Sequence, residues 1–240
     1  MNFDIVKMDP IIPTMPTSKR PQPPHAERDT YHHGALRQAL IDATDVLLAE
    51  RGVAGFSLRE VARRSGVSPA APAHHFGDAQ GLLEAVATLA FEGLTAALEA
   101  GNARGGSDPG ARLREQGVEY VAFARRHPGR FGLMFRTGVA RGPELERAAH
   151  AAFAALENGV RDLFGVPRGK PLNAAQWEAL VGIWSVVHGY AHLALAGQFS
   201  AGGTKTGRAH ADGAVRAVLQ RQLDGLAAVE RAGTEPSDGG

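Results

Sequence analysis

Apolar residues recur at helical spacing along most of this chain, and that periodicity is the feature that most constrains its fold. In the first such run, Leu36, Leu40, Ala43 and Leu47 follow one another at intervals of four, three and four residues. This spacing places all four on one face of an α-helix. No stretch alternates apolar and polar residues as a half-buried strand does. The pattern therefore predicts an all-α protein.

Helix start and stop signals divide the periodic pattern into about nine helices. Residues that cap helix N-termini, such as Asp78, Asp108 and Asn173, precede several apolar runs, and glycine or proline closes them. Ser57 followed by Glu60 has capping-box spacing, and Ser68 followed by proline predicts another helix start. The expected helices cover residues 31–51, 57–65, 68–76, 78–101, 108–127, 131–135, 143–164, 173–199 and 214–229.

Both ends of the chain lack this periodicity. Residues 1–29 hold six of the fourteen prolines and show no repeating apolar face, so we expect a disordered tail there. A second disordered tail is expected over residues 231–240.

Charge and cysteine content limit the classes of function. The 26 Lys and Arg residues almost balance 25 Asp and Glu residues, so a site for a polyanion must be local. The absence of cysteine excludes disulfides, Cys-ligated metals and a thiol nucleophile. Since no run of 18 apolar residues and no secretory signal pattern occurs, we expect no membrane span and a cytoplasmic protein.

The turn Ser65-Gly66-Val67 joins two short expected helices at helix-turn-helix spacing. Glycine at its centre supplies the positive φ that a tight reversal needs. Small apolar side chains would let the two helices cross closely, and cations would lie on the outward side. The apolar residues are Val61, Ala62 and Val67, and the cations are Arg59, Arg63 and Arg64. From these residues alone, DNA binding and an ordinary helical hairpin with a solvated face are both open.

The sequence around this turn resembles a known family. Residues 31–37, 49–52, 56–62, 65–68 and 75–76 resemble the N-terminal domain of TetR-family transcriptional regulators. Trp184, His188 and Gly189 resemble the Trp-His-Gly (WHG) signature of one C-terminal subclass of that family. The resemblance implies a helix-turn-helix DNA-binding domain over residues 30–78 and a helical effector-binding and dimerisation domain over residues 79–230.

The resemblance also implies which residues face DNA. The matching positions are Ser57, Arg59, Ser68, Ala70, Ala71, His74, His75 and His33. The expected partner is a pseudo-palindromic double-stranded operator, bound by a homodimer. Two phosphate contacts typical of the family are missing, because a usual tyrosine is Ala73 and a usual lysine is Ala79. Pro72 is a further departure, since as a fourth helical residue it would loosen the first turn of the recognition helix.

Aromatic and flexible side chains in the C-terminal half are candidates for an effector pocket or for plain core. They are Phe123, His127, Phe131, Met134, Phe135, Phe153, Trp177 and His188. His188 and His192 are also spaced to share a metal, but with no third ligand a helix contact is the preferred interpretation. The dimer interface is expected at Trp184, Gly189, Leu195, Leu219 and Leu223.

These features predict a ligand-responsive homodimeric repressor with an unidentified small-molecule effector and no cofactor or metal. No nucleophile elbow, dinucleotide-binding glycine motif or complete phosphate-loop motif occurs, so we do not expect an enzyme. The alternative is an all-helical ligand-binding or interaction protein with degraded operator recognition. Ala73, Ala79 and Pro72 motivate that alternative.

Overall fold

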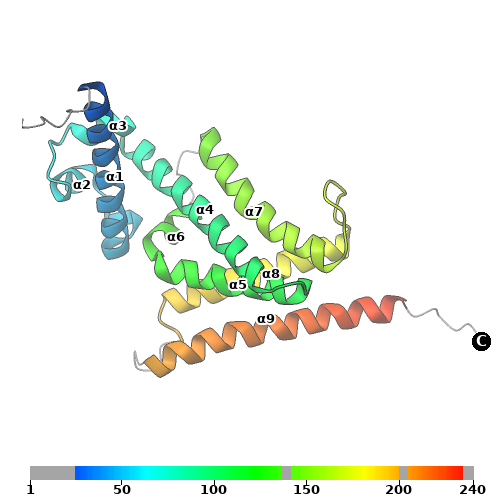
Figure 1. The fold of residues 1–240 in the computed structure, drawn as a ribbon. Helices are drawn as coiled ribbons and strands as arrows, with labels where there is room; N and C mark the ends of the chain where they lie inside the picture. The colour runs from blue at the N-terminus through cyan, green and yellow to red at the C-terminus, as the bar shows by residue number, and fades with distance from the viewer. Residues whose placement is uncertain (1–24, 137–141, 200–204, 235–240) are drawn as a thin grey trace, which may run out of the picture. The chain divides into compact units, whose positions relative to one another are not determined.

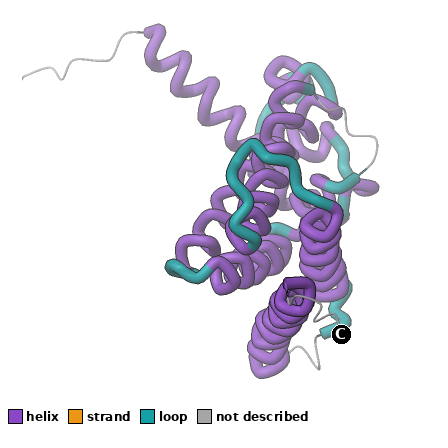
Figure 2. The backbone as a smooth tube through the Cα atoms, turned by 90° about the vertical axis from the view of Figure 1, so that its right-hand side faces the viewer, coloured by secondary structure: helices purple, strands orange, loops and turns teal. Residues whose placement is uncertain are grey.

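The computed structural model describes residues 25–136, 142–199 and 205–234, without the side chains of residues 25–33, 205–212 and 229–234. These residues contain nine α-helices and one short 3-10 helix, and no strand (Figure 2). The prediction of an all-α protein is therefore confirmed for the described part of the chain.

The helices are α1 (His25–Arg51), η1 (Val53–Gly55), α2 (Leu58–Arg64), α3 (Ala71–Phe76), α4 (Ala79–Arg104), α5 (Pro109–Arg126), α6 (Pro128–Met134), α7 (Pro143–Leu163), α8 (Ala174–Leu195) and α9 (Lys205–Thr234). The chain has two compact units, residues 1–36 and residues 37–240, so their boundary lies within α1. All contacts described below lie within the second unit.

Local capping residues set most of the helix starts as expected. The side chain of Asp78 accepts from the amide of Gly81 at 2.9 Å, and that of Asp108 accepts from Ala111 at 3.0 Å. Asn173 forms a reciprocal capping box with Gln176. Each cap satisfies amides that have no partner inside the first helical turn.

Helix extents differ from the expectation at several places, and α6, for example, begins at Pro128 instead of residue 131. α1 begins at His25, so residues 25–29, expected in the tail, are helical. α9 runs from Lys205 to Thr234 and extends into the expected tail at 231–240. Residues 25–29 hold one alanine and three charged residues, so apolar periodicity could not show that extension. α8 ends at Leu195, before Gly197, whose φ is +75°.

α4 is the central helix of the second unit, and it packs on α3 near its start and on α5 and α7 over its length (Figure 1). α4 and α5 approach closely at Gly101, where a Cβ atom would lie 2.7 Å from the carbonyl oxygen of Glu115. By length and mean hydropathy α4 could cross a membrane, but 44% of that window is buried inside the protein. It is the core helix of this unit.

α9 covers α5 and α8 through its apolar face. Val215, Leu219 and Leu223 on this face are buried within the single chain. Gly117 of α5 makes room for them, because a Cβ atom there would lie 2.7 Å from Leu219 Cδ1. The lower part of Figure 1 shows α9 running beneath α5 and α8.

Candidate DNA-binding hairpin and ligand cavity

The α2–α3 segment has the geometry of a helix-turn-helix. The Ser57 hydroxyl accepts from the Glu60 amide at 3.5 Å, which caps α2. Gly66 has φ +67°, and the amide of Val67 donates to the Ala62 carbonyl at 3.1 Å, which fixes the turn. Val61 and Ala62 are buried. The hairpin is therefore held by its glycine turn and by a small apolar contact, as the spacing predicts.

Glu60 does not complete the expected capping box. Its carboxylate instead binds Arg63 at 2.8 Å and Arg64 at 2.9 Å, and Arg64 also binds Glu50 at 2.6 Å. The hydrogen bonds from Arg63 and Arg64 lower the pKa of Glu60 to about 2. Two of the three cations expected on the outward side are therefore already paired. Arg59 is exposed and makes no ion pair with a described residue.

α3 begins later than expected. Its N-cap is Ala70, and Ser68 lies in the preceding turn, where its carbonyl accepts from the Ala71 amide at 3.0 Å. Pro72 is therefore the second helical residue, where an amide has no intrahelical partner in any case. Its ring is buried. The expectation that Pro72 loosens the first turn is wrong for this reason.

Most of the residues expected to face DNA are accessible. Ser57, Arg59, Ser68, Ala70 and His74 are exposed, and Ala71 and His75 are half-buried. The side chain of His33 lies outside the described residues. Ala73 is exposed, and Ala79 is the half-buried first residue of α4. The guanidinium of Arg37 lies 5.3 Å from the centre of the Phe76 ring and covers the C-terminal end of α3.

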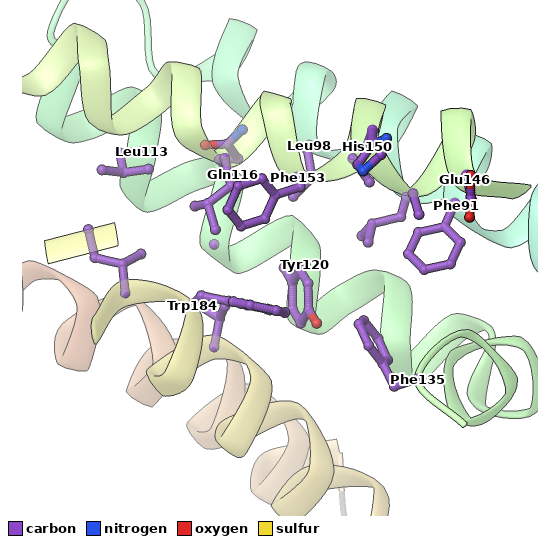
Figure 3. Close-up of a pocket in the computed structure, with 17 residues that line it drawn as sticks. Phe91, Leu98, Leu113, Gln116, Tyr120, Phe135, Glu146, His150, Phe153 and Trp184 are labelled. Atoms are coloured by element: carbon purple, nitrogen blue, oxygen red, sulfur yellow. The ribbon is translucent and has the colours of Figure 1, made fainter. Parts of the chain in front are cut away.

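A cavity of about 390 Å³ lies between α4, α5, α7 and α8 (Figure 3). This volume falls within the range typical of small-molecule sites. The lining residues are Phe91, Leu94, Leu98, Leu113, Gln116, Gly117, Tyr120, Phe135, Glu146, Ala149, His150, Ala152, Phe153, Leu156, Ile183, Trp184 and Val187. Most of this lining is apolar or aromatic.

A hydrogen-bond chain runs from the cavity wall to the surface of α8. The Tyr120 hydroxyl lies 2.8 Å from His188 Nδ1. His188 Nε2 lies 3.2 Å from His192 Nε2. Burial raises the pKa of Tyr120 above its ordinary value, so its hydroxyl stays protonated. Burial, and then the nearby His192, lower the pKa of His188.

The structure brings only two of the eight expected pocket residues to the cavity, Phe135 and Phe153. Phe123, Phe131 and Met134 are buried in the core outside the lining, His127 is exposed between α5 and α6, and Trp177 is half exposed. His188 lies behind Tyr120 and reaches the cavity only through it. The sequence analysis missed Gln116 and Tyr120. Their helical spacing after Leu113 places these two polar residues on the apolar face of α5, and that position was the signal available in the sequence.

The residues expected at a dimer interface differ in how far they are exposed. Trp184 lines the cavity and is half-buried, and Leu219 and Leu223 are buried against the same chain. Gly189 is exposed, with open space where a Cβ atom would lie, and Leu195 is half-buried. The apolar stripe of α9 is thus covered by the protein's own helices, and the dimer interface stays a prediction.

His188 and His192 serve a helix contact. Both ring nitrogens of His188 have partners, Tyr120 on α5 and His192 on the same helix. Across the described segments, no group of three or more potential ligands (His, Cys, Asp or Glu) is placed to hold a metal. The preferred interpretation of this pair as a helix contact agrees with these bonds.

Two segments of the chain match known families. Residues 40–86 match the family described as "Bacterial regulatory proteins, tetR family", and residues 113–221 match "Tetracyclin repressor-like, C-terminal domain". The chain is 41% identical over 78 residues to the HTH-type transcriptional regulator BetI of Burkholderia thailandensis. That match covers 32% of this chain and 40% of the relative, so the likeness to this curated protein is confined to less than half of its length.

Solved structures match over most of the chain. A protein of unknown function from a Rhodococcus species is 32% identical, with a TM-score of 0.66 over 82% of this chain and 97% of that one. The TetR-family transcriptional regulator PfmR from Thermus thermophilus is 21% identical, with a TM-score of 0.58 over 77% of this chain and 97% of its own. With its hairpin inside the first matched family segment and its cavity spanning the second, the chain belongs to the TetR family of bacterial transcriptional regulators.

Proposed function

We propose that this protein is a cytoplasmic, ligand-responsive repressor that binds a pseudo-palindromic operator as a homodimer and leaves it when a small molecule fills the cavity. The observation that carries the proposal is the coexistence in one compact unit of an exposed helix-turn-helix and an apolar cavity. The family consists of regulators and not enzymes, which agrees with the absence of a catalytic motif from the sequence.

α3 is the helix that we assign to the major groove. Its exposed side chains are small or imidazole: Ala70, Ala73 and His74. Alanine methyl groups suit apolar contact with thymine better than hydrogen-bonded recognition of guanine. Ser57 and Arg59, both exposed at the start of α2, are placed to bind phosphates. Because Arg63 and Arg64 are already paired, Arg59 is the cation of α2 that we expect to contact the DNA backbone.

The dimer interface that we propose uses the outward faces of α8 and α9. Val181 and Leu193 on α8 are 39% and 49% exposed, which is unusual for such large apolar side chains. Gly189 lies between them on the same exposed side. On α9 the exposed positions include Ala214, Ala217 and Ala228. Small residues on one helix facing large apolar residues on another allow close packing in a four-helix interface.

The cavity and the hairpin are connected through α6 and α1. Phe135, directly after α6, lines the cavity. At the other end of α6, Arg130 binds Asp45 of α1 with Nε to Oδ1 at 2.7 Å. A Cβ atom on Gly129 would lie 2.7 Å from the backbone nitrogen of Ala49, so α6 rests directly on α1. A ligand that displaces Phe135 would therefore act on α1, and it shifts the operator equilibrium by its differential affinity for the two states.

The test is binding to genomic fragments that flank the gene, measured by gel shift and by fluorescence anisotropy. We expect one fragment to bind specifically, and we expect Arg59→Gln to weaken that binding. Arg147→Gln is the matched control, because Arg147 is a comparably exposed arginine on α7, far along the chain from the hairpin. Absence of specific binding to every fragment by a folded protein would contradict the proposal and favour the ligand-binding alternative.

A further inference from the structure

We infer that the cavity takes an organic cation, whose apolar, ring-bearing body fills the interior and whose ammonium group lies beside the carboxylate of Glu146. This inference rests on the proposed role of the cavity as the effector site. It adds the chemical class of the effector and the residue that recognises its charge.

The interior of the cavity offers a ligand mostly carbon. Five of the 17 lining residues carry nitrogen or oxygen in their side chains, and the others are phenylalanine, aliphatic residues and one glycine. Aromatic walls pack well against the faces and edges of a ligand ring. An apolar ring system therefore fits this interior better than a hydrated molecule. The five polar side chains are Gln116, Tyr120, Glu146, His150 and Trp184.

The polar groups of the interior are neutral, so none of them selects a ligand by charge. The amide nitrogen of Gln116 donates to the Ala155 carbonyl at 2.8 Å, and its Oε1 is buried against α7, out of reach of a ligand. The Tyr120 hydroxyl bonds to His188 and stays protonated, because burial raises the pKa of Tyr120. Trp184 contributes a neutral indole donor.

Glu146 brings the opposite situation, a carboxylate that a ligand can reach. It lines the cavity and is exposed, so it lies where the cavity meets solvent. No described residue forms an ion pair with it, and no lysine or arginine lines the cavity. A ligand ammonium group would gain a charged hydrogen-bond partner there. A ligand carboxylate or phosphate would lose hydration without gaining a cation.

The contacts at the start of α7 place Glu146 at one end of the cavity. The amide of Gly142 donates to the carboxylate of Glu84 on α4 at 2.9 Å. Glu146 is one helical turn farther along α7. In Figure 3 it lies at the end of the lining opposite Leu113. The charge of the ligand is therefore expected at this end, with its apolar body extending towards Leu113.

Two aromatic rings favour a cation at the same end. Phe91 and Phe135 line the cavity there in Figure 3, and their ring centres are 6.0 Å apart in an edge-to-face arrangement. A cation is attracted to the face of an aromatic ring, whereas an anion is not. Phe135 is also the residue through which we propose that the cavity acts on α6. The charged end of the ligand would thus lie at the end of the cavity that faces the hairpin connection.

The test compares three probes of one shape by isothermal titration calorimetry on the full chain. They are 4-phenylbenzylamine, a cation, 4-phenylbenzyl alcohol, which is neutral, and biphenyl-4-carboxylate, an anion. Because histidine ordinarily titrates below about pH 8, measurements at about pH 8 isolate the charge of Glu146 from that of His150. We expect the amine to bind about fivefold more tightly than the alcohol, and the carboxylate to bind most weakly. Added salt should reduce the advantage of the amine, since it screens exposed charges.

Two glutamate variants assign the preference to its residue. Glu146→Gln removes the charge at the same size, so the amine and the alcohol should then bind within about twofold of each other. Glu144→Gln is the matched control, because Glu144 lies in the same first turn of α7 and is exposed but does not line the cavity. Both variants remove one negative charge near the α7 N-terminus, and only Glu146→Gln should lose the preference. Circular dichroism establishes that both are folded.

Three results would overturn the inference: no binding of any probe, equal or reversed preference in the wild type, or a preference that survives unchanged in Glu146→Gln. Operator binding by the unliganded protein is measured separately by gel shift. Specific operator binding without a preference for the amine overturns the ligand class alone. Absent operator binding with the preference intact contradicts the repressor and supports the cation site.

Discussion

Removal of one hydroxyl, by Tyr120→Phe, should destabilise the protein measurably. Tyr120 is 5% exposed, and its hydroxyl is hydrogen-bonded to His188 Nδ1. The substitution keeps the ring and therefore its contact with Phe131, whose centre lies 5.6 Å away. It leaves His188 Nδ1 without its partner. The loss is thus one of hydrogen bonding, with little change in packing.

The magnitude follows from the loss of this one hydrogen bond. A buried polar group that loses its partner costs about 1–3 kcal/mol. His188 is only half-buried, so water can replace part of the bond. We therefore expect a total loss of about 1–2 kcal/mol in the free energy of unfolding. With a urea m-value of about 2–3 kcal/mol/M, the midpoint should fall by roughly 0.3–1 M.

The assay is urea unfolding followed by circular dichroism and by tryptophan fluorescence at one fixed protein concentration, because dimerisation makes stability depend on concentration. Coincident transitions by the two probes establish two-state behaviour. His188→Ala and the double variant complete a mutant cycle, in which residues in direct contact should couple by about 0.5–1 kcal/mol. Strictly additive losses, or a urea midpoint unchanged in Tyr120→Phe, would refute the conclusion that the bond between Tyr120 and His188 stabilises the protein.

Three further predictions concern the dimer, the operator and pH. Gly189→Leu should weaken dimerisation by about 1–3 kcal/mol in sedimentation equilibrium, whereas Gly132→Leu, at an exposed position of α6, should not. Equal effects would exclude Gly189 from the interface. Ala79→Lys should steepen the dependence of log affinity on log salt by about 0.9, and an unchanged slope would place Ala79 away from phosphates. Burial lowers the pKa of His188 below the ordinary value of about 6.5, and partial desolvation together with the cations of Arg130 and Arg126 lowers that of His127. The unfolded chain therefore binds more protons, and stability should decrease as pH falls through about 6.5 towards the folded-state values. Urea midpoints that stay constant over this range would contradict the depressed pKa values.

Helix starts could be predicted wherever one residue determines them. Asp78, Asp108 and Asn173 each accept an amide two or three residues later, and this chemistry is local. Ser68 carried the same signal, followed by proline, yet it lies in a turn before α3. A Ser-Pro pair initiates a turn as readily as a helix. Only the packing of the buried Pro72 ring shows which of the two forms here.

The cavity could not be predicted from the sequence, because a cavity wall and a core position have the same pattern. Phe131 and Phe135 lie one helical turn apart and are both aromatic. Phe131 is fully buried, with its ring 5.6 Å from Tyr120 and 5.4 Å from His192, whereas Phe135 lines the empty space. Periodicity shows which face of a helix turns inward. It does not show whether facing helices fill the volume between them.

The spacing of the Trp-His-Gly motif could be read from the sequence, whereas the residue on α5 that the motif contacts could not. Trp184 and His188 lie one turn apart on α8, and His188 binds the hydroxyl of Tyr120, 68 residues before it. Gly189 does not help α8 approach α5, because its own Cβ position is open and exposed. A glycine inside a helix costs about 1 kcal/mol relative to alanine. No described residue of this chain lies within 4 Å of that Cβ position, so we expect Gly189 to pack on the outward face of α8, where a second copy is proposed to dock.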